Sequence, residues 1–266
     1  MAAHLSVAAI LLSGMVSNSL SLEPEGKWKL DARETSCVLQ HEFSGNGQTW
    51  SAALLPQPGS PRIELLLTQR APQKNRRTGD KASLTIRPSG TVFQGDVQTT
   101  AMPDGAVAYH IWIDTSLLVA LPETIDMEIA VDRSPAIVLP LPGMAAAAAA
   151  LGTCEQDLLA SWGVDPSRFR PAFPLSKVSG FPTSADYPPG ASGASGRVAL
   201  LLELSSTGKV TGCGLIESSG NAVLDRQTCN IALSRMHFAP LRDADGKPIG
   251  SWTTFRFRWT APPDPN

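Results

Sequence analysis

The C-terminal part of the chain, from Tyr187 to Trp259, carries turn residues between apolar runs in a fixed order. Glycine tolerates the left-handed backbone that tight turns need, and proline cannot continue a helix or sit in a central strand. These residues therefore fix where strands and helices can lie. In order, the motifs are Tyr187-Pro188, Gly196-x-Val198, Gly208-x-Val210, Ser218-Ser219-Gly220, Leu224-Asp225, Phe238-x-Pro240 and Gly246-x-Pro248.

The runs between these motifs predict a β-β-α-β unit. Alternating apolar residues over Gly196–Leu204 and a second run over Val210–Glu217 flank a tight turn at Gly208, as in a β-hairpin. The run Trp252–Trp259 predicts a last strand, with Phe255, Phe257 and Trp259 on one face. The helix is expected to pack across one face of the resulting three-stranded antiparallel sheet.

The predicted helix follows the second strand. Asn221 is expected to cap its N-terminus, and Asp225 in the first turn suits the helix dipole. A core-facing stripe is expected at i, i+3, i+4 and i+7. Its members are Cys229, Ala232, Leu233 and Met236.

With its ordered motifs, the stretch from about residue 180 to 260 resembles the C-terminal domain of the TonB family of energy transducers. That resemblance implies a periplasmic domain that binds short peptide segments of outer-membrane transporters. The family residues matched here are Tyr187, Pro188, Gly196, Gly208, Ser218, Ser219, Gly220, Leu224, Asp225, Phe238 and Pro240.

The resemblance also implies a binding mode, in which the partner peptide adds as a strand beside the last strand of the domain. Carried over to this chain, the partner-binding edge comprises Ser251, Trp252, Thr253, Thr254, Phe255, Arg256, Phe257 and Arg258. Arg256 and Arg258 are either contacts for acidic or polar groups of the partner or ordinary solubilising charges.

The cysteine positions favour two disulfides. The chain has four cysteines and no Cys-x-x-Cys pair, and a zinc site would need closer spacing. Four cysteines allow three pairings. Their positions favour Cys37 with Cys154, and Cys213 on the second strand with Cys229 on the helix; free buried thiols are the alternative for the second pair.

The N-terminal half predicts a separate β-rich domain, residues 22–163, so the overall fold class is α+β. Short runs with turn residues between them are typical of an antiparallel sandwich or barrel. An Ala-rich helix, Met144–Ser161, closes the domain and ends at Gly163. The predicted strands are Cys37–Phe43, Trp50–Leu55, Arg62–Thr68, Ser83–Arg87, Thr91–Val97, Ala106–Asp114 and Met127–Val131.

Residues 1–21 predict export. The apolar run Leu5–Val16 is shorter than the roughly 20 residues of a membrane span and is followed by small residues suited to cleavage. The region before it lacks Lys and Arg, so the alternatives are a cleaved signal, an uncleaved inner-membrane anchor or a buried helix. A Pro-rich linker, 164–186, joins the N-terminal domain to the TonB-like domain, 187–262.

The sequence contains no recognisable catalytic or nucleotide-binding motif, so neither an enzyme nor a cofactor or metal site is expected. A net charge of -2 argues against nucleic-acid binding. Two hypotheses remain. One is an energy-transducer-type protein that docks on outer-membrane transporters, coupled to the ExbB and ExbD proton channel if it is anchored. The other is a structural or regulatory envelope protein that uses the TonB-like domain only for interaction.

Overall fold

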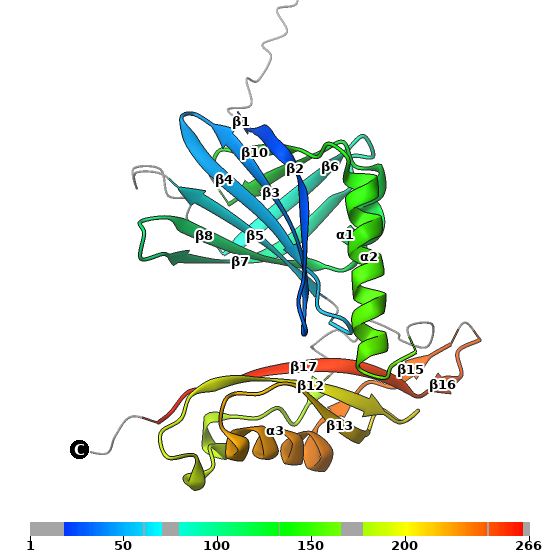
Figure 1. Ribbon diagram of the computed structural model, residues 1–266. Coiled ribbons are helices and arrows are strands. Elements are labelled where there is room, and N and C mark those ends of the chain that lie inside the picture. Colours follow the sequence, from blue (N-terminus) through cyan, green and yellow to red (C-terminus); the bar gives the residue numbers. More distant parts are fainter. Residues whose placement is uncertain are drawn as a thin grey trace, which may run out of the picture.

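The computed structural model describes residues 19–60, 62–70, 80–132, 134–165, 178–243 and 245–262. It has an α+β fold whose two main sheets are a large N-terminal sheet and a three-stranded C-terminal sheet packed against a helix (Figure 1); two two-stranded sheets accompany them. The predicted signal or anchor segment, Leu5–Val16, lies outside the described residues. No helix in the described ranges has the length and apolar character required to cross a membrane.

The N-terminal domain is one ten-stranded sheet in the order β1-β10-β9-β6-β7-β8-β5-β4-β3-β2. Apart from the parallel pair β1–β10, neighbouring strands are antiparallel. The strands are β1 Leu20–Ser21, β2 Glu23–Ala32, β3 Cys37–Gly45, β4 Gln48–Leu55, β5 Arg62–Arg70, β6 Lys81–Arg87, β7 Val92–Ala101, β8 Val107–Asp114, β9 Asp126–Val131 and β10 Ile137–Pro140.

This sheet curls until its ends approach each other, so the domain is nearly a barrel (Figure 1). The indole N–H of Trp28 on β2 donates to the carbonyl of Pro142 just after β10 (2.9 Å) and links the two ends. Successive side chains of a strand point to opposite faces of the sheet, and one face is packed in the interior of the barrel. On β5 the side chains of the interior face include Ile63, Leu65 and Leu67. The seven predicted strands are present, and the structure selects the curled sheet over the sandwich.

The structure adds β1, β2 and β10, which the sequence analysis did not predict. Most residues of β2 are exposed, and the four residues of β10, Ile-Val-Leu-Pro, include no polar residue, so neither sequence shows the apolar–polar alternation that marks a half-buried strand. Because Leu20–Ser21 pairs with β10 and Leu22 is fully buried, the folded domain includes residues assigned above to the segment 1–21.

Helix α2, Met144–Ser161, spans the predicted residues and runs along the barrel toward the C-terminal domain (Figure 1). Met144, Ala147, Leu151 and Leu158 pack into the barrel core. A short helix, α1 Ser116–Ala120, and a 3-10 turn, Leu121–Glu123, precede β9.

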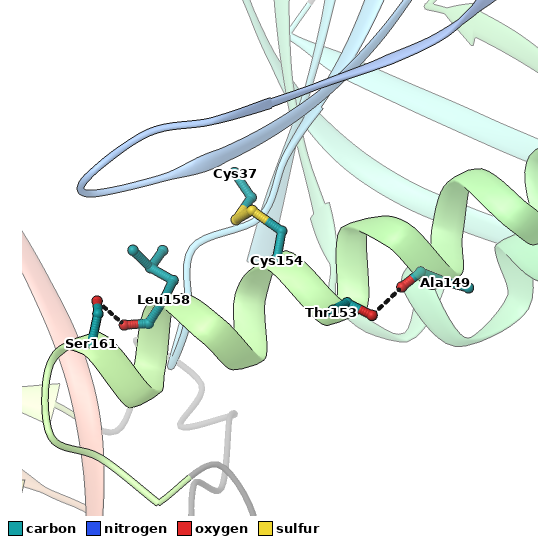
Figure 2. Close-up of a disulfide and its surroundings, with 6 residues drawn as sticks. All are labelled: Cys37, Ala149, Thr153, Cys154, Leu158 and Ser161. Atoms are coloured by element: carbon teal, nitrogen blue, oxygen red, sulfur yellow. Dashed lines mark hydrogen bonds between the residues drawn. A yellow bond between two sulfur atoms is a disulfide. The ribbon is translucent and has the colours of Figure 1, made fainter.

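A disulfide joins Cys37 at the start of β3 to Cys154 on α2 (Cα–Cα 6.2 Å; Figure 2). The second bond links Cys213 on β13, Val210–Glu217, to Cys229 on α3, Ala222–Arg235 (Cα–Cα 5.9 Å). Both pairs are those favoured by the cysteine positions in the sequence.

The C-terminal domain has the predicted β-β-α-β order. Strand β12, Gly196–Leu204, is central, with β13 on one side and β17, Ser251–Trp259, on the other. Asn221 caps α3 by accepting bonds from the amides of residues 223 and 224. Two-residue strands complete the domain: β11 Val178–Ser179, β14 His237–Phe238, β15 Leu241–Arg242 and β16 Pro248–Ile249.

Two expectations for this domain need correction. Of the predicted stripe of α3, Ala232 and Met236 are buried, but Leu233 is 40% exposed. Leu224, Thr228 and Ile231 complete the buried face, because packing against the sheet sets which side of the helix is covered. The domain also begins earlier than predicted. β11 pairs with β14, so residues 178–186 belong to the fold; residues 166–177 of the predicted linker lie outside the described residues.

We expect loss of the Cys37–Cys154 bond to destabilise the protein more than loss of the Cys213–Cys229 bond. The two bonds close loops with sequence separations of 117 and 16 residues. The chain-entropy model assigns them about 5 and about 3 kcal/mol, respectively. Denaturant unfolding of the two double-serine variants measures the difference, and equal losses would contradict the loop-length argument.

We also expect Glu155 on α2 to make the protein less stable at neutral pH than at acidic pH. Its spacing of four from Leu151 and Leu159 places it on the buried side of the helix, and burial raises the pKa of its carboxyl to about 7. The unfolded chain releases this proton near the ordinary Glu pKa of 4.5, whereas the folded protein keeps it up to a pH of about 7. The free energy of unfolding therefore falls as the pH rises between these two values. Glu155→Gln should remove the slope between pH 5 and pH 8 in denaturant melts.

The matched control for this prediction is Asp157→Asn, which removes an exposed carboxylate from the same helix. This variant should keep the wild-type slope. A wild-type slope in Glu155→Gln would show that the Glu155 carboxyl does not determine the pH dependence.

Candidate functional site

β17 forms an edge of the three-stranded sheet. All nine of its residues are in register with β12, from the pair Gly196–Trp259 to the pair Leu204–Ser251, and no strand in the described parts of the chain pairs with its other side. The indole N–H of Trp259 donates to the hydroxyl of Thr228 on α3 (2.8 Å) and anchors the end of the strand in the core. Phe255 and Phe257 pack partly into the same core.

The predicted edge residues differ widely in exposure. Ser251 and Thr253 are buried, and Arg258 is exposed. The remaining five are half-buried: Trp252, Thr254, Phe255, Arg256 and Phe257. Of these eight residues, Arg258 alone is therefore exposed.

The cover at the start of β17 comes from the N-terminal domain. The hydroxyl of Thr253 donates to the carbonyl of Gly59 (2.9 Å), and that of Thr254 donates to the carbonyl of Pro58. Trp252 packs against the apolar cluster formed by Leu159, Val164 and Leu201. The two threonine contacts join residues 194 and 196 positions apart, and no motif signalled them.

Arg256 also faces the N-terminal domain, so it is not a simple solubilising charge. Its Nη2 donates to the carbonyl of Thr35 (3.2 Å), and Nη1 is buried without a hydrogen-bond partner among the described residues. Burial lowers the pKa of its guanidinium; Glu217 nearby opposes that shift, and Arg197 adds to it. Arg258 lies opposite Arg197 in the register, and both are exposed.

The motif residues around Ser218 hold the turn that precedes α3 against the first turn of that helix. The carboxylate of Asp225 accepts from the Ser218 hydroxyl (2.6 Å), the Ser219 hydroxyl (2.7 Å) and the Ser219 amide (2.9 Å). Burial favours the neutral acid, but these three bonds outweigh it and hold the pKa of Asp225 below its usual value. Gly220, with φ +84°, completes the turn.

Two motif glycines permit close backbone approaches. A Cβ on Gly196 would lie 2.3 Å from the carbonyl oxygen of Ser219, and one on Gly208 would lie 1.9 Å from that of Phe238. The Phe238 amide donates to the Gly208 carbonyl (2.9 Å), which ties the hairpin turn to the chain after α3. Any side chain at either glycine would force these segments apart.

The other matched residues also support the fold. The Tyr187 hydroxyl donates to the Ala194 carbonyl (2.8 Å), and its ring meets Trp259 edge-on. Leu224 and Phe238 are core residues. Pro188 precedes a short 3-10 turn, and Pro240 is exposed just before β15.

A contact that no sequence pattern signalled holds residues 180–186 against α3. The guanidinium of Arg235 pairs with Asp186 and donates to the carbonyls of Gly180 (3.2 Å) and Phe181 (2.8 Å). The Arg235 bonds hold the pKa of Asp186 well below its usual range. A Pro-rich composition had marked this stretch as linker, and only the packed structure reveals its fixed position.

A groove of about 560 Å³ lies between β2 and α2 beside the first disulfide. Its apolar lining includes Leu30, Ala32, Cys154 and Leu158, with Arg33 and Asp157 among its polar residues. No motif in the sequence pointed to this groove.

Comparison with known families agrees with this geometry. Residues 184–260 match the family model described as Gram-negative bacterial TonB protein C-terminal. The chain therefore contains a TonB-type C-terminal domain, as its motifs predicted. Searches of curated proteins and of solved structures found no match to the chain.

We expect Asp225→Asn to destabilise the C-terminal domain by about 1–3 kcal/mol at pH 7, because the bonds from Ser218 and Ser219 lose their charged acceptor. The folded-state pKa is lowered, so this stabilisation is present above the ordinary Asp pKa and is lost as pH falls through the folded-state value. Denaturant unfolding at pH 7 and below pH 4 should show that the difference in unfolding free energy between wild type and Asp225→Asn becomes smaller in acid.

Asp245→Asn is the control for this experiment, since Asp245 is exposed in the β15–β16 turn. It should leave stability close to that of wild type. If the difference in unfolding free energy between wild type and Asp225→Asn stays constant with pH, the charge of Asp225 is not the source of the lost stability.

Proposed function

We propose that the protein is an exported, TonB-like envelope protein that docks on outer-membrane transporters by strand addition along β17, and that it is a binding protein without catalytic activity. The observation that carries this proposal is the edge position of β17 in a domain of the TonB C-terminal type. Transmembrane transport is the process it would serve.

Strand addition suits this edge physically. An edge strand offers unpaired N–H and C=O groups, and an extended peptide satisfies them while its own backbone bonds are satisfied in return. The part of the edge that follows the turn contacts at Thr253 and Thr254, Phe255–Arg258, is the favoured landing place. There, an added strand would place alternate side chains beside Arg256 and Arg258, on the face away from α3.

Export is supported by the apolar segment Leu5–Val16 and by two disulfides, which persist in oxidising compartments such as the periplasm. Coupling to the ExbB and ExbD channel would require the N-terminal segment to remain as an inner-membrane anchor. Docking on a transporter does not require it.

Strand addition predicts a two-residue periodicity when the backbone of the bound peptide is altered. The probes are synthetic peptides from the N-terminal periplasmic segments of outer-membrane transporters of the same genome, titrated against the full chain. N-methylation of one peptide amide at a time should weaken binding at alternate positions, by about 0.5–1.5 kcal/mol for each lost bond. The intervening positions serve as internal controls.

Arg258→Ala complements this test from the protein side. It deletes an exposed charge and should weaken binding by about 1 kcal/mol or less. Peptides that bind without alternation would rule out strand addition. Failure of every peptide to bind would refute the transporter assignment.

A further inference from the structure

The loop between β4 and β5 reaches the C-terminal domain through a tight turn. The turn Gln57–Ser60 is closed by an amide-to-carbonyl bond between its end residues (2.9 Å). Pro58 and Gly59 hold its central positions, and Gly59 has φ +81°. Proline followed by a positive-φ glycine is the type II pattern, so the local sequence defines this turn.

This turn lies along the outer edge of β17, not over one of its faces. Thr253 and Thr254 are neighbours in a strand, so their side chains point to opposite faces of the sheet. Their hydroxyls nevertheless donate to the consecutive carbonyls of Gly59 and Pro58. Because β12 occupies one side of β17, a single turn can meet both hydroxyls only from the other side.

The face of the sheet away from α3 is covered as well. Leu201 on β12 packs against Leu159 and Val164 at the end of α2, and Arg256 donates to the carbonyl of Thr35 in the β2–β3 loop. The cap surface is defined as Thr35, the turn Gln57–Ser60, Leu159 and Val164. Figure 1 shows the sheet lying between α3 and this end of the N-terminal domain.

The docked arrangement leaves a cation poorly compensated. Arg256 is half-buried, and its Nη1 is removed from solvent without a partner among the residues described. An unsatisfied buried donor of a charged group weakens the contact that buries it. Separating the sheet from the cap surface would return Arg256 to water. Its burial therefore lowers the stability of the contact, which favours a reversible contact.

We propose that the N-terminal domain is an intrachain cap that competes with strand partners for the β17 edge. The proposal rests on the proposed function and adds its regulation. In the capped state the turn Gln57–Ser60 blocks the edge at Thr253 and Thr254. A partner peptide that pairs along the whole strand must displace it. The affinity of the full chain is then the intrinsic affinity reduced by the fraction of uncapped molecules.

The test uses two full-length variants that weaken the cap from the N-terminal side and leave β17 unchanged. Leu159→Asp places a charge in the apolar cluster with Leu201, and Gly59→Val puts a β-branched residue at a positive φ and displaces the turn. Val119→Asp is the matched control, because Val119 is 83% exposed on α1. Hydrogen–deuterium exchange over residues 251–255 and titration with the transporter peptides are measured on all proteins.

In both cap variants we expect faster exchange over residues 251–255 than in wild type. Peptide binding should tighten by about tenfold if the wild type is about one-tenth uncapped. Val119→Asp should match wild type in both measurements. The cap is overturned if all four proteins exchange alike over this segment. If no peptide binds any of them, the docking function fails, while the exchange result still decides whether the edge is capped.

Discussion

The disulfide between Cys37 and Cys154 is the constraint on which the arrangement of the two domains depends. Cys37 lies two residues after Thr35, whose carbonyl accepts from Arg256, and Cys154 lies on the helix that carries Leu159. The bond therefore ties together two of the elements that contact the C-terminal sheet. A barrel with loose loops at this end would present no defined surface, since loops are the most mobile parts of a fold.

The residues that identify the C-terminal domain have structural roles. The bonds to Asp225 and the close approaches at Gly196 and Gly208 all fix backbone positions. A family motif of this kind marks the fold. Activity has to be argued from the surface of the edge strand, because one fold serves many functions.

The sequence predicted local features well and long-range contacts poorly. Strands β12, β13 and β17 and helix α2 follow from alternation, from turn glycines and from the alanine run. Strand β2 was missed because it buries few side chains, and Leu233 was misplaced because the exact phase of α3 depends on packing. The bonds of Thr253 and Thr254 to the turn Gln57–Ser60 leave no trace in periodicity, since hydroxyls and backbone carbonyls occur throughout the chain.

Arg256 lies on the edge strand β17 and also contacts the cap surface. In the capped state its guanidinium gives one bond to Thr35 and leaves Nη1 without a partner in the described structure. On an added strand, a carboxylate opposite this position could accept from both nitrogens, which makes a stronger pair than a single bond to a neutral carbonyl. Such a residue would favour the partner-bound state over the capped one. The balance between cap and partner then depends on how well each satisfies the same cation.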